Sequence, residues 1–96
     1  MDEMKTHEVM FTQLILMFHT AAMQQLGKLK NPLSDTIEKN LEAAQNSIDI
    51  LDMLHAKTKG NLSQDESRLL KQVLQELRLN YVDEAQKVTP SDGKTS

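Results

Sequence analysis

Apolar residues recur at helical spacing along the first part of the chain, from about residue 4 to residue 26. Apolar positions three and four residues apart are typical of an amphipathic helix. This stripe consists of Met10, Phe11, Leu14, Ile15, Met17, Phe18, Ala21, Ala22 and Leu26. Gly27 suits the left-handed residue that ends a helix, and Pro32 prevents the helix from continuing. We therefore expect a first helix over residues 4–26.

The second helix is expected to begin at Ser34 or Asp35. Asp35 is followed three residues later by Glu38, a variant of the capping box with Asp in place of Ser or Thr. Apolar residues then alternate in steps of four and three, a heptad pattern, with His55 at its end. The pattern consists of Ile37, Leu41, Ala44, Ile48, Leu51 and His55, and a shorter stripe of Ala43, Ile50 and Leu54 lies beside it. Two stripes indicate a helix with neighbours on two sides.

A third helix follows Gly60 and starts at the capping box that Ser63 and Glu66 form. One face of it carries Leu69, Leu70, Val73, Leu74, Leu77 and Tyr81. The segment from residue 85 to residue 96 is polar and lacks periodicity, and is expected to be disordered.

These elements predict an all-α fold with three helices in an antiparallel up-down-up arrangement, in which the first two form a long hairpin. Residues 1–84 would form a single helical domain, and residues 85–96 a disordered tail.

Composition narrows the function classes. The 96 residues are 39% hydrophobic and 26% charged, which is ordinary for a globular domain. The chain has no cysteine, which excludes disulfides and Cys-ligated zinc and fits a cytoplasmic location. A net charge of −3 and the absence of a basic tail argue against a nucleic-acid partner. Polar residues interrupt the apolar stretch 9–26, and the first residues are acidic, so we expect neither a membrane span nor a signal peptide.

Several short blocks are shared with a known family. They are Leu26-Gly27, Asn31-Pro32, Ile48-Asp49 ahead of Leu51 and Leu54, the block Lys57-Thr58-Lys59-Gly60-Asn61-Leu62, Glu66, Leu69-Leu70, Leu77-Arg78 and Tyr81. On these residues the stretch of about 8–83 resembles the bacterial domain-of-unknown-function family 1844. Leu33-Ser34-Asp35 departs from the Thr-Gly-Glu usual in that family. The resemblance implies a small bacterial cytosolic helical protein and implies no activity.

Three histidines raise the alternative of a ligand- or metal-binding protein that uses His7, Asp52 and His55. Asp52 and His55 have the i, i+3 spacing found in di-iron bundles, and the antiparallel hairpin would bring His7 towards them. Such sites need two copies of the motif and two further carboxylates, and the chain has one copy. No nucleophile, nucleotide-binding or other catalytic motif is present, so we expect neither an enzyme nor a cofactor.

The block Lys57, Thr58, Lys59, Gly60 and Asn61 is a candidate contact for an anion or a protein partner, because the free amides of the following helix N-terminus lie just beyond it. The structural alternative is that the lysines favour the end of the second helix and that Gly60 adopts positive φ.

Apolar residues outside the main stripes point to self-association. Val9, Leu16 and Met23 are spaced by seven, His19 lies between them, and Leu79 is outside the main face of the third helix. Three helices of this size cannot bury every side, and methionine repacks easily at a contact. These five residues are the predicted interface of a homo-oligomer, or of a complex with an unidentified protein.

Overall fold

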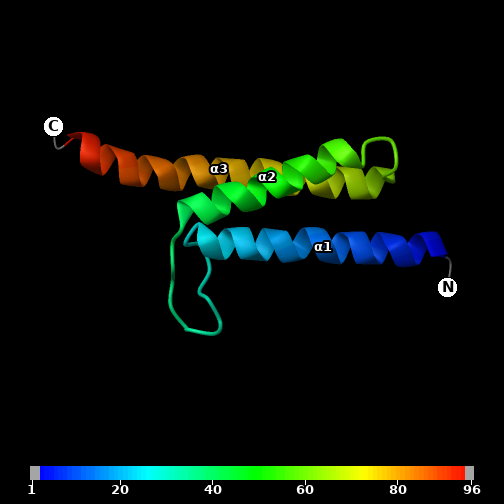
Figure 1. Ribbon diagram of the computed structural model, residues 1–96, viewed down its shortest axis with the longest axis horizontal. Helices are drawn as coiled ribbons and strands as arrows, with labels where there is room; N and C mark the ends of the chain where they lie inside the picture. The colour runs from blue at the N-terminus through cyan, green and yellow to red at the C-terminus, as the bar shows by residue number, and fades with distance from the viewer. Residues whose placement is uncertain (1–2, 95–96) are drawn as a thin grey trace.

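The computed structural model describes residues 3–94, with side chains to residue 87. It contains α1 (Glu3–Gln25), α2 (Leu41–Lys57) and α3 (Gln64–Lys94). The helices run up, down and up, and each packs against both others (Figure 1). The molecule measures 58 × 30 × 15 Å, and α1 begins and α3 ends at opposite ends of its long axis. The predicted all-α antiparallel arrangement is confirmed.

The core is a single aliphatic cluster to which all three helices contribute. It comprises Ile15, Ala22, Leu26, Ala44, Ile48, Leu51, Leu70, Val73, Leu74 and Leu77. These residues confirm the centre of the heptad pattern in α2 and the predicted face of α3. The prediction is wrong for Met10 and Met17, whose side chains are 58% and 67% exposed. Residues of α1 are apolar around most of its circumference, so periodicity alone did not identify the buried part.

Backbone hydrogen bonds close the end of α1 as the sequence predicted. Gly27 has φ +83°, its N–H donates to the Gln24 carbonyl, and the Lys28 N–H donates to the Met23 carbonyl. This pair of bonds is a Schellman motif, and it requires the left-handed conformation that glycine adopts without a steric penalty.

Helix α2 begins at Leu41, six or seven residues after the predicted start at Asp35 or Ser34, so the prediction that Asp35 and Glu38 form its capping box is wrong. Asp35 itself has φ +57°, and the surrounding residues form a turn closed by an antiparallel bridge between Asn31 and Thr36. The Glu38 carboxylate accepts hydrogen bonds from Asn31 and Thr36 instead of capping a helix. Asn40 caps α2, its side-chain oxygen accepting from the Ala43 N–H at 3.0 Å.

Helix α3 begins at the predicted capping box. The Ser63 N–H donates to the Glu66 carboxylate at 2.8 Å, and the Glu66 N–H donates to the Ser63 hydroxyl at 3.1 Å. The helix does not end near residue 84 but continues to Lys94. Residues 85–94 of the predicted tail are therefore helical and belong to α3. The cause is tertiary: Glu84 is buried in ion pairs, one of which reaches Lys87 in the next turn. Residues 95–96 of the predicted tail, like residues 1–2 of the predicted domain, lie outside the described residues.

The observed start of α2 predicts that substitutions at Asn40 and at Asp35 have different effects on stability. Asn40→Ala removes the side-chain acceptor for the Ala43 N–H and is expected to lower the free energy of unfolding by about 1 kcal/mol. Asp35→Gly is expected to change it by less than about 0.5 kcal/mol, because glycine tolerates the positive φ of this position. Urea denaturation followed by circular dichroism measures both. A larger loss for Asp35→Gly than for Asn40→Ala would contradict the observed start of α2.

Candidate functional site

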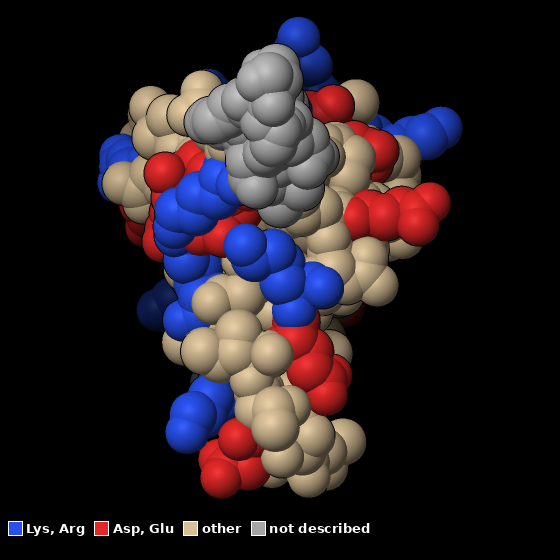
Figure 2. Space-filling model, turned by 90° about the vertical axis from the view of Figure 1, so that its left-hand side faces the viewer, with Lys and Arg blue, Asp and Glu red and all other residues tan. Residues whose placement is uncertain are grey.

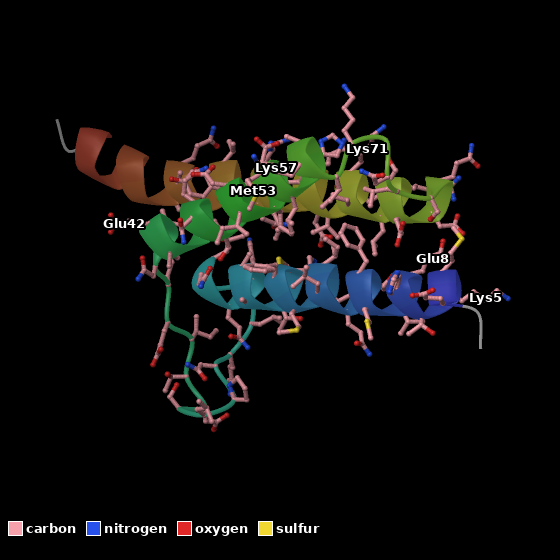
Figure 3. All side chains as sticks on the ribbon, turned by 45° about the vertical axis from the view of Figure 1, so that its right-hand side comes forward. Lys5, Glu8, Glu42, Met53, Lys57 and Lys71 are labelled. Carbon is pink, nitrogen blue, oxygen red and sulfur yellow. The ribbon has the colours of Figure 1, made fainter. Side chains whose placement is uncertain are left out.

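The side of α1 that faces away from α2 and α3 is the best candidate for a functional surface. This surface, which we call the outer face of α1, consists of Val9, Met10, Gln13, Leu16, Met17, Thr20, Ala21 and Gln24. Figure 3 shows methionine sulfur atoms projecting from α1 away from the other helices. Six of these residues, from Gln13 to Gln24, line a shallow depression with a volume of about 640 Å³.

The outer face of α1 also lacks full charges. Residues 9–27 contain no Asp, Glu, Lys or Arg, and the nearest charged side chains are Glu8 and Lys28. Its polar groups are amides and hydroxyls, which both donate and accept hydrogen bonds. An apolar surface that is free of charge at its centre is typical of the core of a protein–protein interface.

The five residues of the predicted oligomer interface are not on one surface. Val9 and Leu16, which are 53% and 45% exposed, lie on the outer face of α1. Met23 packs against the core, and the His19 imidazole lies 3.2 Å from the Glu76 carboxylate of α3. Leu79 is 66% exposed and lies on α3, beside the groove between α2 and α3. Met10 and Met17 were assigned to the buried stripe but belong to the outer face.

Where both ends of the α1–α2 connection meet α3, Glu84 is the centre of an ion-pair cluster. Its side chain is 6% exposed and contacts Lys28 and Lys39 at 2.7 Å each and Lys87 at 3.0 Å. Asp83 also contacts Lys28, at 3.2 Å. Figure 2 views this end of the molecule and shows basic side chains, in blue, beside acidic side chains, in red. Hydrogen bonds from Lys28, then from Lys39 and Lys87, lower the pKa of Glu84 to about 2.

Sequence reasoning missed this cluster, although a signal for it exists. Glu84 follows Leu77 by seven residues and Leu70 by fourteen, so it occupies the next heptad position of the buried face of α3. An acidic residue in a buried position needs partners of opposite charge. Lys28 and Lys39 are 56 and 45 residues away in sequence, and no local pattern links them to Glu84.

The pKa of Glu84 gives a pH-dependent prediction. Because its pKa of about 2 is below the ordinary 4.5, the ionised form stabilises the fold above pH 4.5, and this contribution is lost as the pH falls towards 2. Glu84→Gln should lower the free energy of unfolding at pH 7 by about 2 kcal/mol, since it replaces charged hydrogen bonds. Urea denaturation between pH 7 and pH 3 should show the difference from the unsubstituted protein shrinking below pH 4.5.

The matched control is Glu42→Gln, which removes a carboxylate that is exposed and forms no ion pair with any described residue. This variant should change stability by less than about 0.5 kcal/mol. A Glu84→Gln effect of equal size at pH 7 and pH 3 would contradict the electrostatic role of the cluster.

The candidate anion site at Lys57–Asn61 is a capped turn in the structure. Thr58 donates from its hydroxyl to the Leu54 carbonyl at 2.6 Å, the Asn61 N–H donates to the Thr58 carbonyl, and Gly60 has φ +89°. The first turn of α3 already carries Asp65 and Glu66. An anion at this helix end would face those carboxylates, so the geometry favours the structural interpretation of the block.

The structure does not bring the three residues of the alternative metal site, His7, Asp52 and His55, together. The Asp52 carboxylate accepts a hydrogen bond from Arg78 at 2.8 Å. His55 borders the groove between α2 and α3, and His7 borders a different depression on α1. Within residues 3–94, no group of three or more His, Asp or Glu side chains is placed to hold a metal ion.

The sequence was compared with known families and proteins. Residues 8–84 match the family described as "Domain of unknown function (DUF1844)". The chain belongs to this family. The predicted resemblance is therefore confirmed, and the matched range in this DUF1844 protein extends from α1 through the ion-pair cluster at Glu84. No curated protein and no solved structure matches the chain.

The matched range includes Lys28, Lys39 and Glu84 of the ion-pair cluster and ends three residues before Lys87. None of the helices in the described part of the DUF1844 protein combines the length and the apolar character that a membrane span requires.

Proposed function

We propose that this DUF1844 protein is a non-catalytic interaction module that forms homo-oligomers through the outer face of α1. The observation that carries the proposal is the combination of exposure and missing charge on that face. Leu16 and Met17 are 45% and 67% exposed, and no full charge lies between residues 9 and 27. Contiguous apolar surface of this kind is a marker of protein–protein contact.

A second copy of the same chain suits this surface. In a two-fold symmetric dimer the same patch meets itself, so a charge close to the two-fold axis would lie beside its own copy. The outer face of α1 carries no such charge. Gln13, Thr20 and Gln24 can each donate and accept hydrogen bonds, so these side chains can pair with their own counterparts. Methionine side chains adapt their shape to such a contact.

The proposal that the protein is non-catalytic is supported by the low pKa of the Glu84 carboxyl group. The pKa of Glu84 is the most strongly shifted among the described residues, and three lysines hold this carboxylate in its ionised form. A general acid or base needs a pKa near the working pH. Glu84 is therefore suited to holding the fold together and not to proton transfer.

The test is the mass in solution of the double variant Leu16→Glu, Met17→Glu. The unsubstituted chain of 10.9 kDa should have at least the mass of a dimer in light scattering at about 100 µM. Two buried carboxylates without partners should weaken the contact by about a hundredfold or more, so that the double variant is a monomer. Met23 is left unchanged because it packs against the core, and its substitution would also affect folding.

Leu33→Glu is the matched control, since it makes the same chemical change at a side chain that is 96% exposed on the α1–α2 connection. It should keep the mass of the unsubstituted protein, and circular dichroism should show all variants equally helical. A monomeric unsubstituted protein at about 100 µM would overturn the proposal.

A further inference from the structure

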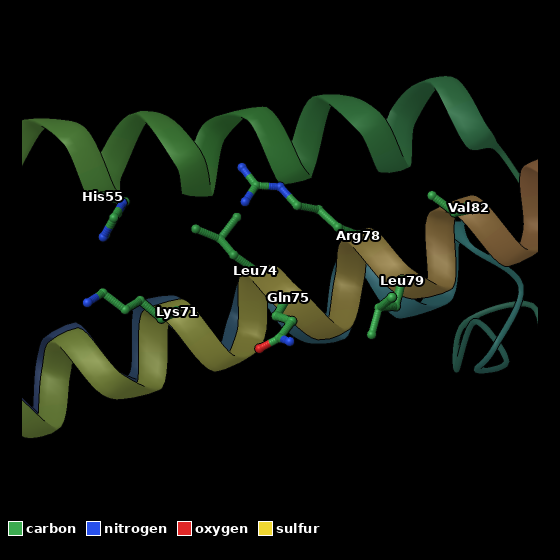
Figure 4. Close-up of a pocket in the computed structure, with 7 residues that line it drawn as sticks. All are labelled: His55, Lys71, Leu74, Gln75, Arg78, Leu79 and Val82. Atoms are coloured by element: carbon green, nitrogen blue, oxygen red, sulfur yellow. The ribbon is translucent and has the colours of Figure 1, made fainter.

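A groove between α2 and α3 forms a second surface that shares no residue with the outer face of α1. It has a volume of about 500 Å³, and Leu74, Leu79 and Val82 supply its apolar lining (Figure 4). Leu74 is buried, whereas Leu79 and Val82 are 66% and 52% exposed. The bottom of the groove is therefore formed by a buried apolar side chain, and apolar side chains at its rim are exposed to solvent.

Within the described part of the chain, three ionisable side chains line this groove, and none of them is acidic. These side chains are His55, Lys71 and Arg78. In Figure 4, His55 and Lys71 face each other across one end of the groove, and Arg78 reaches across it towards α2. Arg78 pairs with Asp52 at 2.8 Å, whereas Lys71 forms no ion pair with any described residue. The end at His55 and Lys71 thus offers uncompensated positive charge beside apolar surface.

The groove continues past Arg78 along the two helices. Arg78 and Val82 also border an adjoining depression of about 350 Å³, which Gln45 and Asp49 line from α2. From Gln45 to His55 the two depressions follow about 15 Å of α2, since a helix rises 1.5 Å per residue. This length corresponds to about three helical turns, with positive charge at the His55 end and Asp49 at the other.

Charge and shape select one kind of occupant. A second copy that placed the outer face of α1 in this groove would bring no acidic side chain to Lys71, because residues 9–27 contain no Asp or Glu, whereas an acidic helix of another protein would. The groove is also open along its length, whereas small-molecule sites enclose most of their ligand. A helix laid into an apolar groove uses side chains at positions i, i+3, i+4 and i+7, and three turns are enough to present them.

We infer that the groove between α2 and α3 binds an amphipathic helical segment of another protein, with aliphatic side chains towards Leu74, Leu79 and Val82 and with Asp or Glu at the end beside His55 and Lys71. The inference uses no residue of the outer face of α1 and is independent of the proposed homo-oligomer.

The experiment is a selection with the full-length protein as immobilised target. The probe is a displayed library of helical peptides of about fourteen residues, with leucines fixed at positions i, i+3, i+4 and i+7 and with Glu, Lys, Gln or Ala at the flanking positions. We expect peptides with Glu in one terminal turn to be enriched. Synthetic peptides from the enriched pool should bind at least about tenfold more tightly, by fluorescence anisotropy, than versions with Lys in place of those Glu residues.

Two exposed lysines provide a matched pair of variants. Lys71→Glu should remove or reverse the preference for the acidic peptide, whereas Lys59→Glu makes the same charge change in the loop before α3, outside the groove, and should leave the preference intact. Leu79→Asp should abolish enrichment. Enrichment of basic peptides, no enrichment at all, or equal effects of Lys71→Glu and Lys59→Glu would overturn the inference.

Discussion

The ion pairs of Glu84 are the constraint on which the arrangement of the three helices depends. Lys28 belongs to the capping motif at the end of α1, and Lys39 directly precedes the cap of α2, so one carboxylate of α3 contacts both ends of the long connection. The aliphatic core is non-directional and leaves the relative positions of the helices less defined. Glu84 adds specific, short contacts that fix where α1 ends and α2 begins relative to α3.

The same packing decides which surfaces remain open. Helix α2 has neighbours on two sides, and the buried face of α3 is covered by both other helices. Helix α1 also packs against both other helices, but the side that it leaves uncovered carries no full charge, because residues 9–27 contain no Asp, Glu, Lys or Arg. The outer face of α1 is therefore an uncharged, largely apolar surface that is exposed to water. Of the three helices, α1 has the strongest physical reason to bind a partner.

Sequence reasoning succeeded where the interacting residues are close in the chain. Ser63 and Glu66, the Schellman motif at Gly27 and the aliphatic face of α3 are local signals, and the structure confirms them. The Asp35–Glu38 pair matched a local signal equally well but serves a turn that Asn31 organises. The outer face of α1 was only partly predicted, because apolar periodicity does not show which part of a nearly all-apolar helix faces the core. For the Glu84 cluster, the heptad spacing signals that Glu84 is buried, but no local pattern identifies Lys28 and Lys39 as its partners.

The connection between α1 and α2 has a consequence of its own. Its tip, the turn between Asn31 and Thr36, projects from the helices and carries Leu33 almost fully exposed (Figure 1). Both flanks are fastened by lysines to the same carboxylate. A cut in the polypeptide at Leu33 would therefore separate no buried contact, and the two pieces would stay associated through the core and Glu84. This tip is a natural place to insert a peptide tag.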